Sequence, residues 1–241
     1  MTSTRTVTPF PIAVPDSDLD DLRRRLDGYD WGALVVRHLG QHFAPRVAAI
    51  HTNRLFAPFD GDPAEAMNGV TESELASIVS SAERVAGGTA YMDIQSTLPH
   101  SLGYGLDDSP LGLAGWILEK FHAWCDVREG MPIRTDRLVD NLMMYWLTGT
   151  TTSAARLYCE AARAGNSALS AWHGRVDVPT GYAVYPFELL QTPRVWAERR
   201  YNLVHYSVQD RGGHFAHSNN RNCLPLTSTP TATHFGTSGC F

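Results

Sequence analysis

The chain has 241 residues, with 20 Lys and Arg against 25 Asp and Glu, so its formal net charge is −5. This length allows a substantial core, and the hydrophobic content of 43% excludes a wholly disordered chain. The mild acidity argues against nucleic-acid binding, which needs a basic stripe. No segment approaches the ~20 consecutive apolar residues of a membrane span. We therefore predict no nucleic-acid partner and no membrane span.

The four cysteines form no Cys-x-x-Cys pair, and no spacing of His and Cys fits a zinc site. Three prolines interrupt the apolar part of the first 18 residues, which excludes a signal peptide. We expect reduced thiols in a cytoplasmic protein and no metal.

The first two thirds of the chain predict mainly helices. An amphipathic helix is expected over 16–27 and a second helix over 33–43, followed by a short buried strand over 46–50. A polar stretch covers about 57–69, and apolar residues recur at helical spacing from 75 to 85. Ser109 and Pro110 open a helix that runs toward Cys125. Thr135 opens another helix through Trp146, and a further helix covers 153–163.

Strand character returns in the last third. Residues 177–184 and 203–208 predict strands, and Thr192-Pro193 caps a short helix between them. This order predicts an α/β fold with a helical insertion. Residues 217–241 show no apolar period and are rich in Ser, Thr, Asn and Pro, so we expect a disordered tail.

Three separate motifs carry candidate chemistry. Gly28-Tyr29-Asp30-Trp31-Gly32 has the small-x-nucleophile-x-small pattern of a strained turn, although alone it is more often an ordinary turn. Glu188 follows one predicted strand, and His214 lies in a glycine-rich loop after the next. Either residue alone is usually structural. Their order, nucleophile, acid and then histidine, is that of the α/β-hydrolase triad.

Five longer strings resemble the microsomal-type epoxide hydrolases of the α/β-hydrolase superfamily. They are GYDWGALVVRHLG, AYMDIQSTLPHSLGYGLDDSPLGLAGWILEKF, YWLTGTTTSAARLYCE, VPTGYAVYPFELL and PRVWAERRYNLVHYSVQDRGGHFA. The resemblance runs from about Gly28 to Ala216, and PFPIAVPDSDLDDLRRRL resembles the start of that family's N-terminal domain.

The resemblance implies a role for each matching residue. Asp30 would be the nucleophile that opens an epoxide and forms an ester, and Tyr91 and Tyr158 would donate hydrogen bonds to the epoxide oxygen. His214, oriented by Glu188, would activate the water that hydrolyses the ester. The backbone N–H of Trp31 would serve the oxyanion hole. The resemblance implies a small apolar epoxide and water as substrates, and no cofactor.

The chain departs from this family before Asp30. The family places a long domain, the first strands of the sheet and a His-Gly-x-Pro loop there, whereas residues 20–27 are too charged for a central strand and predict a helix. We therefore expect an incomplete α/β-hydrolase fold that lacks the first strands. Its exposed sheet edge would favour self-association.

The expected organisation has three parts. Residues 1–26 would be a remnant of the N-terminal domain, 27–216 a partial hydrolase domain with a helical lid at about 57–165, and 217–241 the tail. The join at Leu26/Asp27 indicates an internal deletion, and the loss of resemblance after Ala216 indicates a shifted reading frame.

Two alternatives remain open at this stage. A haloalkane dehalogenase also uses an Asp nucleophile followed by Trp, although the tyrosines and the Gly-Gly-His-Phe string favour the epoxide. A non-catalytic remnant that folds only in part would keep the motifs without turnover. Pocket aromatics such as Trp116, Phe121 and Trp146 fit an apolar substrate, but are also ordinary core residues.

Overall fold

A computed structural model describes residues 30–86, 88–163 and 174–216. The helix expected over 16–27 and the tail expected over 217–241 lie outside the described residues, as do Gly28 and Tyr29 of the turn motif.

A parallel sheet of three strands forms the centre of the described fold. The strands are β1 (Ile50–Thr52), β2 (Val176–Val184) and β3 (Tyr201–Val208), in the order β1-β2-β3. Ile50 pairs with Thr180, and Tyr182 with Tyr206. Strand β2 is central and reads as a nearly continuous buried run, as expected for a parallel strand covered on both faces.

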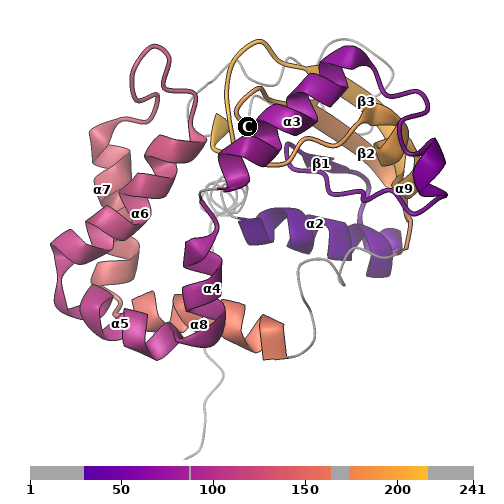
Figure 1. Cartoon of the computed structure of the whole chain (residues 1–241). Coiled ribbons are helices and arrows are strands. Elements are labelled where there is room, and N and C mark those ends of the chain that lie inside the picture. Colours follow the sequence, from indigo (N-terminus) through magenta and orange to yellow (C-terminus); the bar gives the residue numbers. More distant parts are fainter. Residues whose placement is uncertain (1–29, 87, 164–173, 217–241) are drawn as a thin grey trace, which may run out of the picture.

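Helices cover both faces of this sheet (Figure 1). Helix α2 (Asp30–His42) packs against β1 and β2, and α3 (Glu72–Ala86) lies on the opposite side. Helix α9 (Arg194–Arg200) connects β2 to β3 and packs on β3. Short 3₁₀ helices cover Ala44–Arg46 and Pro63–Glu65. The main core lies between these layers and contains Ile50, Leu55, Ala57, Val176, Val178, Tyr182, Val184, Ala197 and Tyr201.

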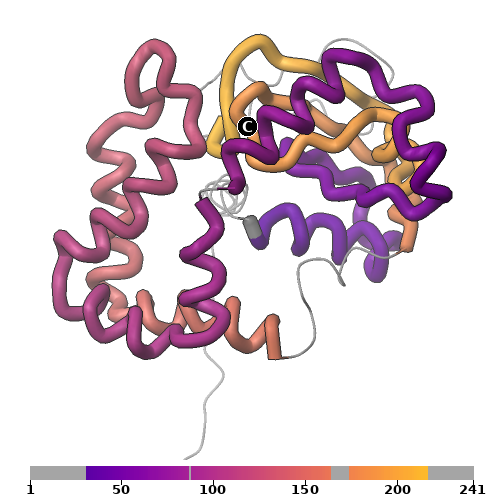
Figure 2. The backbone as a smooth tube through the Cα atoms, in the orientation of Figure 1, coloured from indigo at the N-terminus to yellow at the C-terminus, as the bar shows by residue number. Residues whose placement is uncertain are grey.

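Five further helices form a separate layer beside the sheet. They are α4 (Ala90–Thr97), α5 (Pro99–Asp108), α6 (Pro110–Trp124), α7 (Thr135–Trp146) and α8 (Thr151–Arg163). Helix α8 packs against α4 and α5, and α6 packs against α5 and α7. Figure 2 shows the backbone leaving the sheet after α3 and returning to it at β2. We call α4–α8 the helical layer. Within the described residues, no helix is both long and apolar enough to cross a bilayer.

Most predicted elements are confirmed, and the helical start at Ser109 is confirmed in detail. Its hydroxyl oxygen accepts a hydrogen bond from the N–H of Gly112 at 3.0 Å. Helices expected over 33–43 and 153–163 begin earlier, at Asp30 and Thr151.

Two expectations are wrong. The strand expected over 46–50 is instead a 3₁₀ helix that ends at Arg46, followed by a strand that begins only at Ile50. The N–H groups of Arg46 and Val47 donate to the carbonyls of Phe43 and Ala44 within this turn, so neither is available to a neighbouring strand. Thr192 does not cap α9, because its hydroxyl donates to the carbonyl of Leu55 and Pro193 occupies the N-cap position.

Candidate active site

The loop after β3 holds His214 close to the end of α6. Gly212 has a φ of +110°, in the region that favours glycine, and a Cβ atom on Gly213 would come within 2.4 Å of the carbonyl oxygen of Trp124. That carbonyl accepts the N–H of His214 at 2.9 Å. The two glycines therefore allow the close approach that fixes the backbone of His214.

His214 forms a buried hydrogen bond with Glu188, which lies just beyond β2. The Nδ1 atom of His214 lies 2.8 Å from Oε1 of Glu188, and the side chains are 2% and 1% exposed. The N–H of Leu189 donates to the same oxygen at 2.8 Å. Asn53 donates from Nδ2 to Oε2 of Glu188 at 2.9 Å and to the carbonyl of His214 at 3.0 Å. Both carboxylate oxygens are thus bound, which fixes the orientation of the imidazole.

Arg84 of α3 forms hydrogen bonds with the backbone of the loop that carries Glu188. Its Nη2 atom donates to the carbonyls of Pro186 at 2.9 Å and Glu188 at 3.4 Å. Its guanidinium lies 5.6 Å from the centroid of the Phe187 ring. Burial lowers the pKa of Arg84, and the charge of Glu188 opposes that shift.

Asp126 ties the segment after α6 to the loop of His214. Its carboxylate accepts two hydrogen bonds from Arg128 at 2.7 Å, one from Nε of Arg211 at 2.9 Å and one from the N–H of Gly212 at 3.1 Å. The side chain of Asp126 is 4% exposed. The hydrogen bonds from Arg128, followed by those from Arg211 and Gly212, hold the pKa of Asp126 well below its usual range against the effect of burial.

A continuous row of aromatic rings connects His214 to α2. The ring of Trp124 meets His214 edge to face at 5.4 Å between centroids, and Tyr91 lies 5.6 Å from Trp124. Tyr158 lies 6.1 Å from Tyr91, and Trp31 lies 5.3 Å from Tyr158. The fold therefore brings Trp31, Tyr91, Tyr158 and His214, which come from four separate elements or loops, to one region.

The surroundings of Tyr91 and Tyr158 favour the protonated form of both phenols. Burial is the largest cause that raises the pKa of Tyr91 and of Tyr158 above the ordinary value. The positive charge of Arg54 acts in the opposite direction on both. Protonated phenols are hydrogen-bond donors, which is the form needed to stabilise a developing alkoxide.

Asp30 is the first residue of α2, so its backbone lies at the helix N-terminus, next to Trp31. The contacts of the Asp30 side chain lie outside the described part of the structure. Unpaired N–H groups and the positive end of the helix dipole favour negative charge at such a terminus.

Four residues of this region were not predicted as site residues: Asn53, Arg84, Trp124 and Asp126. Asn53 follows β1 directly, at the same sheet edge as Glu188 and His214. Since polar residues at the carboxyl ends of parallel strands gather in one place, a correct placement of β1 would have indicated Asn53. Among the described residues, no group of three or more His, Cys, Asp or Glu side chains could hold a metal ion.

The sequence and the fold of this chain are similar to those of known proteins. Epoxide hydrolase 1 of Sus scrofa is 36% identical over 211 residues, which cover 79% of this chain and 46% of the pig protein. Over most of its length, the chain is homologous to epoxide hydrolases. The crystal structure of juvenile hormone epoxide hydrolase from the silkworm Bombyx mori matches with a TM-score of 0.67 and 31% identity, over 83% of this chain and 54% of that one.

The structure of Aspergillus niger epoxide hydrolase matches with a TM-score of 0.64 and 28% identity, over 85% of this chain and 52% of that chain. No protein-family model matches the chain. The chain spans about half the length of these epoxide hydrolases. Its described part has an incomplete α/β-hydrolase fold with three parallel strands and a helical layer.

Proposed function

We propose that this chain hydrolyses an apolar epoxide to a diol through an ester on Asp30. The observation that carries this proposal is the buried hydrogen bond between His214 and Glu188. This pair lies in one region with Tyr91 and Tyr158, and the homology to epoxide hydrolases supports the proposed chemistry.

In the first step, the carboxylate of Asp30 attacks one ring carbon of the epoxide. A carbon–oxygen bond forms to Asp30 and the ring carbon–oxygen bond breaks, so negative charge develops on the epoxide oxygen. Tyr91 and Tyr158 donate hydrogen bonds to that oxygen, and one of the two phenols transfers its proton to it as the ring opens and becomes a tyrosinate. The product of this step is a hydroxyalkyl ester of Asp30.

In the second step, His214 removes a proton from water, and the resulting hydroxide attacks the carbonyl carbon of the ester. Glu188 holds the imidazole through Nδ1 and stabilises the imidazolium that forms. The backbone N–H of Trp31 stabilises the negative oxygen of the tetrahedral intermediate. Collapse of the intermediate releases the diol, whose leaving oxygen takes the proton from His214. The carboxylic acid formed on Asp30 returns its proton to the tyrosinate, which restores the starting state.

The surroundings of the reacting groups favour an apolar substrate. Trp31, Tyr91, Trp124 and Tyr158 supply aromatic surface, and we propose the helical layer as the lid of the site. A neutral epoxide would bind between these rings, with its oxygen at the tyrosine hydroxyls.

The decisive experiment is diol formation by the purified chain, compared with Asp30→Ala. A single turnover in ¹⁸O-labelled water should give diol without label, because the ester passes an oxygen of Asp30 to the product. Label in the first diol, or equal rates with and without Asp30, would exclude the ester mechanism. Chloride release from a haloalkane without diol from any epoxide would favour a dehalogenase. Absence of both activities would favour a non-catalytic relative.

A further inference from the structure

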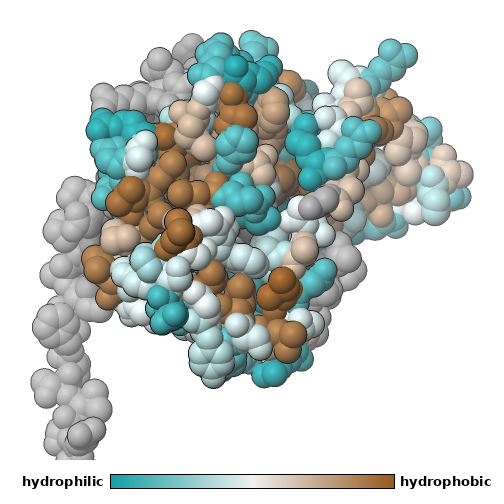
Figure 3. Space-filling view, turned by 60° about the vertical axis from the view of Figure 1, so that its left-hand side comes forward, coloured by the Kyte–Doolittle hydropathy of each residue, from teal (hydrophilic) through white to brown (hydrophobic). Residues whose placement is uncertain are grey.

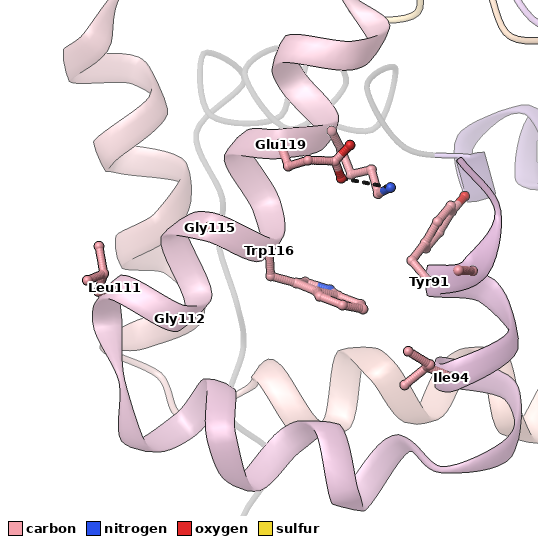
Figure 4. Close-up of a pocket in the computed structure, with 9 residues that line it drawn as sticks. Tyr91, Ile94, Leu111, Gly112, Gly115, Trp116 and Glu119 are labelled. Atoms are coloured by element: carbon pink, nitrogen blue, oxygen red, sulfur yellow. Dashed lines mark ion pairs between the residues drawn. The ribbon is translucent and has the colours of Figure 1, made fainter. Parts of the chain in front are cut away.

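Helix α2 carries two histidines that the candidate active site does not use. Hydrophobic residues gather on the face of the molecule that carries the helical layer (Figure 3), and a cavity lined by Tyr91 and Trp116 lies between α4 and α6 of that layer (Figure 4). Helix α2 lies outside this layer and packs on β1 and β2. His38 and His42 lie in its last two turns, and both side chains are exposed.

The two imidazoles lie next to each other on one face of the helix. Positions i and i+4 of an α-helix are neighbours on its surface. The ring centroids of His38 and His42 are 4.4 Å apart, with an angle of 41° between the ring planes. Because a zinc ion lies ~2.0–2.1 Å from an imidazole nitrogen, two rings that share such an ion have centroids roughly 4–5 Å apart. The observed separation is therefore already the one that a shared ion requires.

The opposite side of α2 keeps this pair at the surface. Gly40, which lies between the two histidines in sequence, faces the sheet, since a Cβ atom there would come within 2.9 Å of the Val176 side chain. The buried Arg37 donates from Nη2 to the carbonyl of Gly174 at 2.8 Å, and its guanidinium lies 5.0 Å from the centroid of the Tyr201 ring. These contacts fix the rotation of α2 about its axis, so both imidazoles stay on the solvent side.

The position of the pair on α2 favours a bound cation. His42 is the last residue of the helix. Carbonyl groups at a helix C-terminus and the negative end of the helix dipole stabilise positive charge there. Imidazole nitrogens are ligands for nickel, copper and zinc ions, whereas magnesium and calcium ions prefer oxygen ligands. The chemistry of the two ligands therefore selects a transition-metal ion.

We infer that His38 and His42 form a two-imidazole site for a divalent transition-metal ion such as Ni²⁺, with water in the other coordination positions. Two protein ligands are fewer than the three or four of a zinc site, so the spacing differs from that of zinc motifs. The centroid separation of 4.4 Å fits two neighbouring positions of a tetragonal ion, the geometry that Ni²⁺ and Cu²⁺ adopt with nitrogen ligands. The ion would join two successive turns at the end of α2. The inference does not depend on the proposed function.

The test is binding of Ni²⁺, supplied alone, to the full chain by isothermal titration calorimetry at neutral pH. The variants are His38→Ala, His42→Ala and the double variant. Alanine is the best helix former, so these exposed substitutions should leave α2 intact. His100→Ala is the matched control, because His100 is an exposed histidine of α5 and no histidine lies three or four positions from it. The second readout is the thermal midpoint with Ni²⁺ and with EDTA.

We expect the unchanged chain and His100→Ala to share one Ni²⁺ site that each single variant weakens at least about tenfold, because one chain no longer presents two linked ligands. The double variant should bind Ni²⁺ no more weakly than either single variant, since both imidazoles serve the same ion. Ni²⁺ should raise the thermal midpoint of the unchanged chain and of His100→Ala more than that of the other variants. Equal Ni²⁺ binding by His42→Ala and His100→Ala, or losses that add in the double variant, would overturn the inference.

Discussion

The Nδ1 atom of His214 lies 2.8 Å from Oε1 of Glu188, although 26 positions separate the two residues in sequence. Both side chains are almost completely buried, and the carboxylate is held by Leu189 and Asn53 as well. Such a pair costs free energy to bury unless every partner is satisfied. The hydrogen bonds to both oxygens of the Glu188 carboxylate explain how the fold accommodates its burial.

Glu188→Gln should slow the second step of the proposed reaction and leave the first step intact. The amide keeps the size of the side chain but no longer stabilises an imidazolium, so we expect kcat to fall by roughly 10⁴-fold, as for the equivalent change in a serine protease triad. Rapid quenching and mass spectrometry should show the ester on Asp30 accumulating. Glu198→Gln, at an exposed ion pair with Arg194, should change neither kcat nor the amount of ester. Failure of the ester to accumulate while diol formation is lost would contradict this assignment.

Asn53→Ala should lower both stability and turnover. It removes two buried hydrogen bonds, to Glu188 and to the carbonyl of His214, so we expect a loss of about 1–3 kcal/mol in the free energy of unfolding. Urea unfolding and steady-state kinetics check this. The matched variant is Asn202→Ala, which removes an exposed bond to the carbonyl of Asp177. Similar losses in the two variants would mean that Asn53 has no special role in holding Glu188.

Asp126→Asn should destabilise the chain at neutral pH and much less in acid. The pKa of Asp126 is lowered in the folded state, chiefly by Arg128. The ionised carboxylate therefore contributes to the free energy of unfolding above the unfolded pKa of about 3.9. This contribution is lost as the pH falls through the pKa of the folded state. The thermal midpoint of the variant should therefore fall at pH 7 and approach that of the unchanged chain below pH 3.

The control for Asp126 is Asp136→Asn, at an ion pair with Arg134 in which both side chains are more than half exposed. Pairs of this kind contribute about 0–1 kcal/mol, so the midpoint should barely move. If the difference in thermal midpoint between Asp126→Asn and the unchanged chain stayed constant from pH 7 to pH 2, the charge of the carboxylate would not be the source of its stabilising effect.

Tyr91→Phe and Tyr158→Phe should each reduce kcat/KM by ~10²-fold, the usual effect of removing one donor to a developing oxyanion. Because burial raises the pKa of both phenols, the unchanged chain should keep these donors above pH 10, the ordinary value for tyrosine. Tyr104→Phe, at a tyrosine that is 76% exposed, is the control. An alkaline loss of activity below pH 9 that both phenylalanine variants abolish would contradict the assignment.

Whether the sequence indicated a candidate site residue after a strand depended on whether that strand could be recognised. Glu188 and His214 were identified because each comes just after a recognisable strand, in the chain order of a known triad. Asn53 was missed because its strand is only three residues long and was placed too early. The role of Trp124 depends on a carbonyl that meets the loop of His214, a contact that no local pattern encodes.

Tyr91 and Tyr158 show a different limit of sequence reasoning. Both lie on helices, where an aromatic residue is usually part of a core. Only the resemblance to a family gave them a role, and only the fold shows that their rings lie 6.1 Å apart. The helix that carries Tyr158 was predicted, whereas α4, which carries Tyr91, and its packing on α8 were not.

The pairing of β1 with β2 has a consequence for how the chain reaches this structure. Ile50 and Thr180 are partners although they lie roughly 130 residues apart, whereas β2, α9 and β3 are consecutive. Closing so long a loop costs conformational entropy that the three residue pairs of β1 repay only after the helices between them have compacted. Assembly should therefore begin within the β2–α9–β3 unit. Asn53, which follows β1, would reach Glu188 and His214 among the last contacts to form.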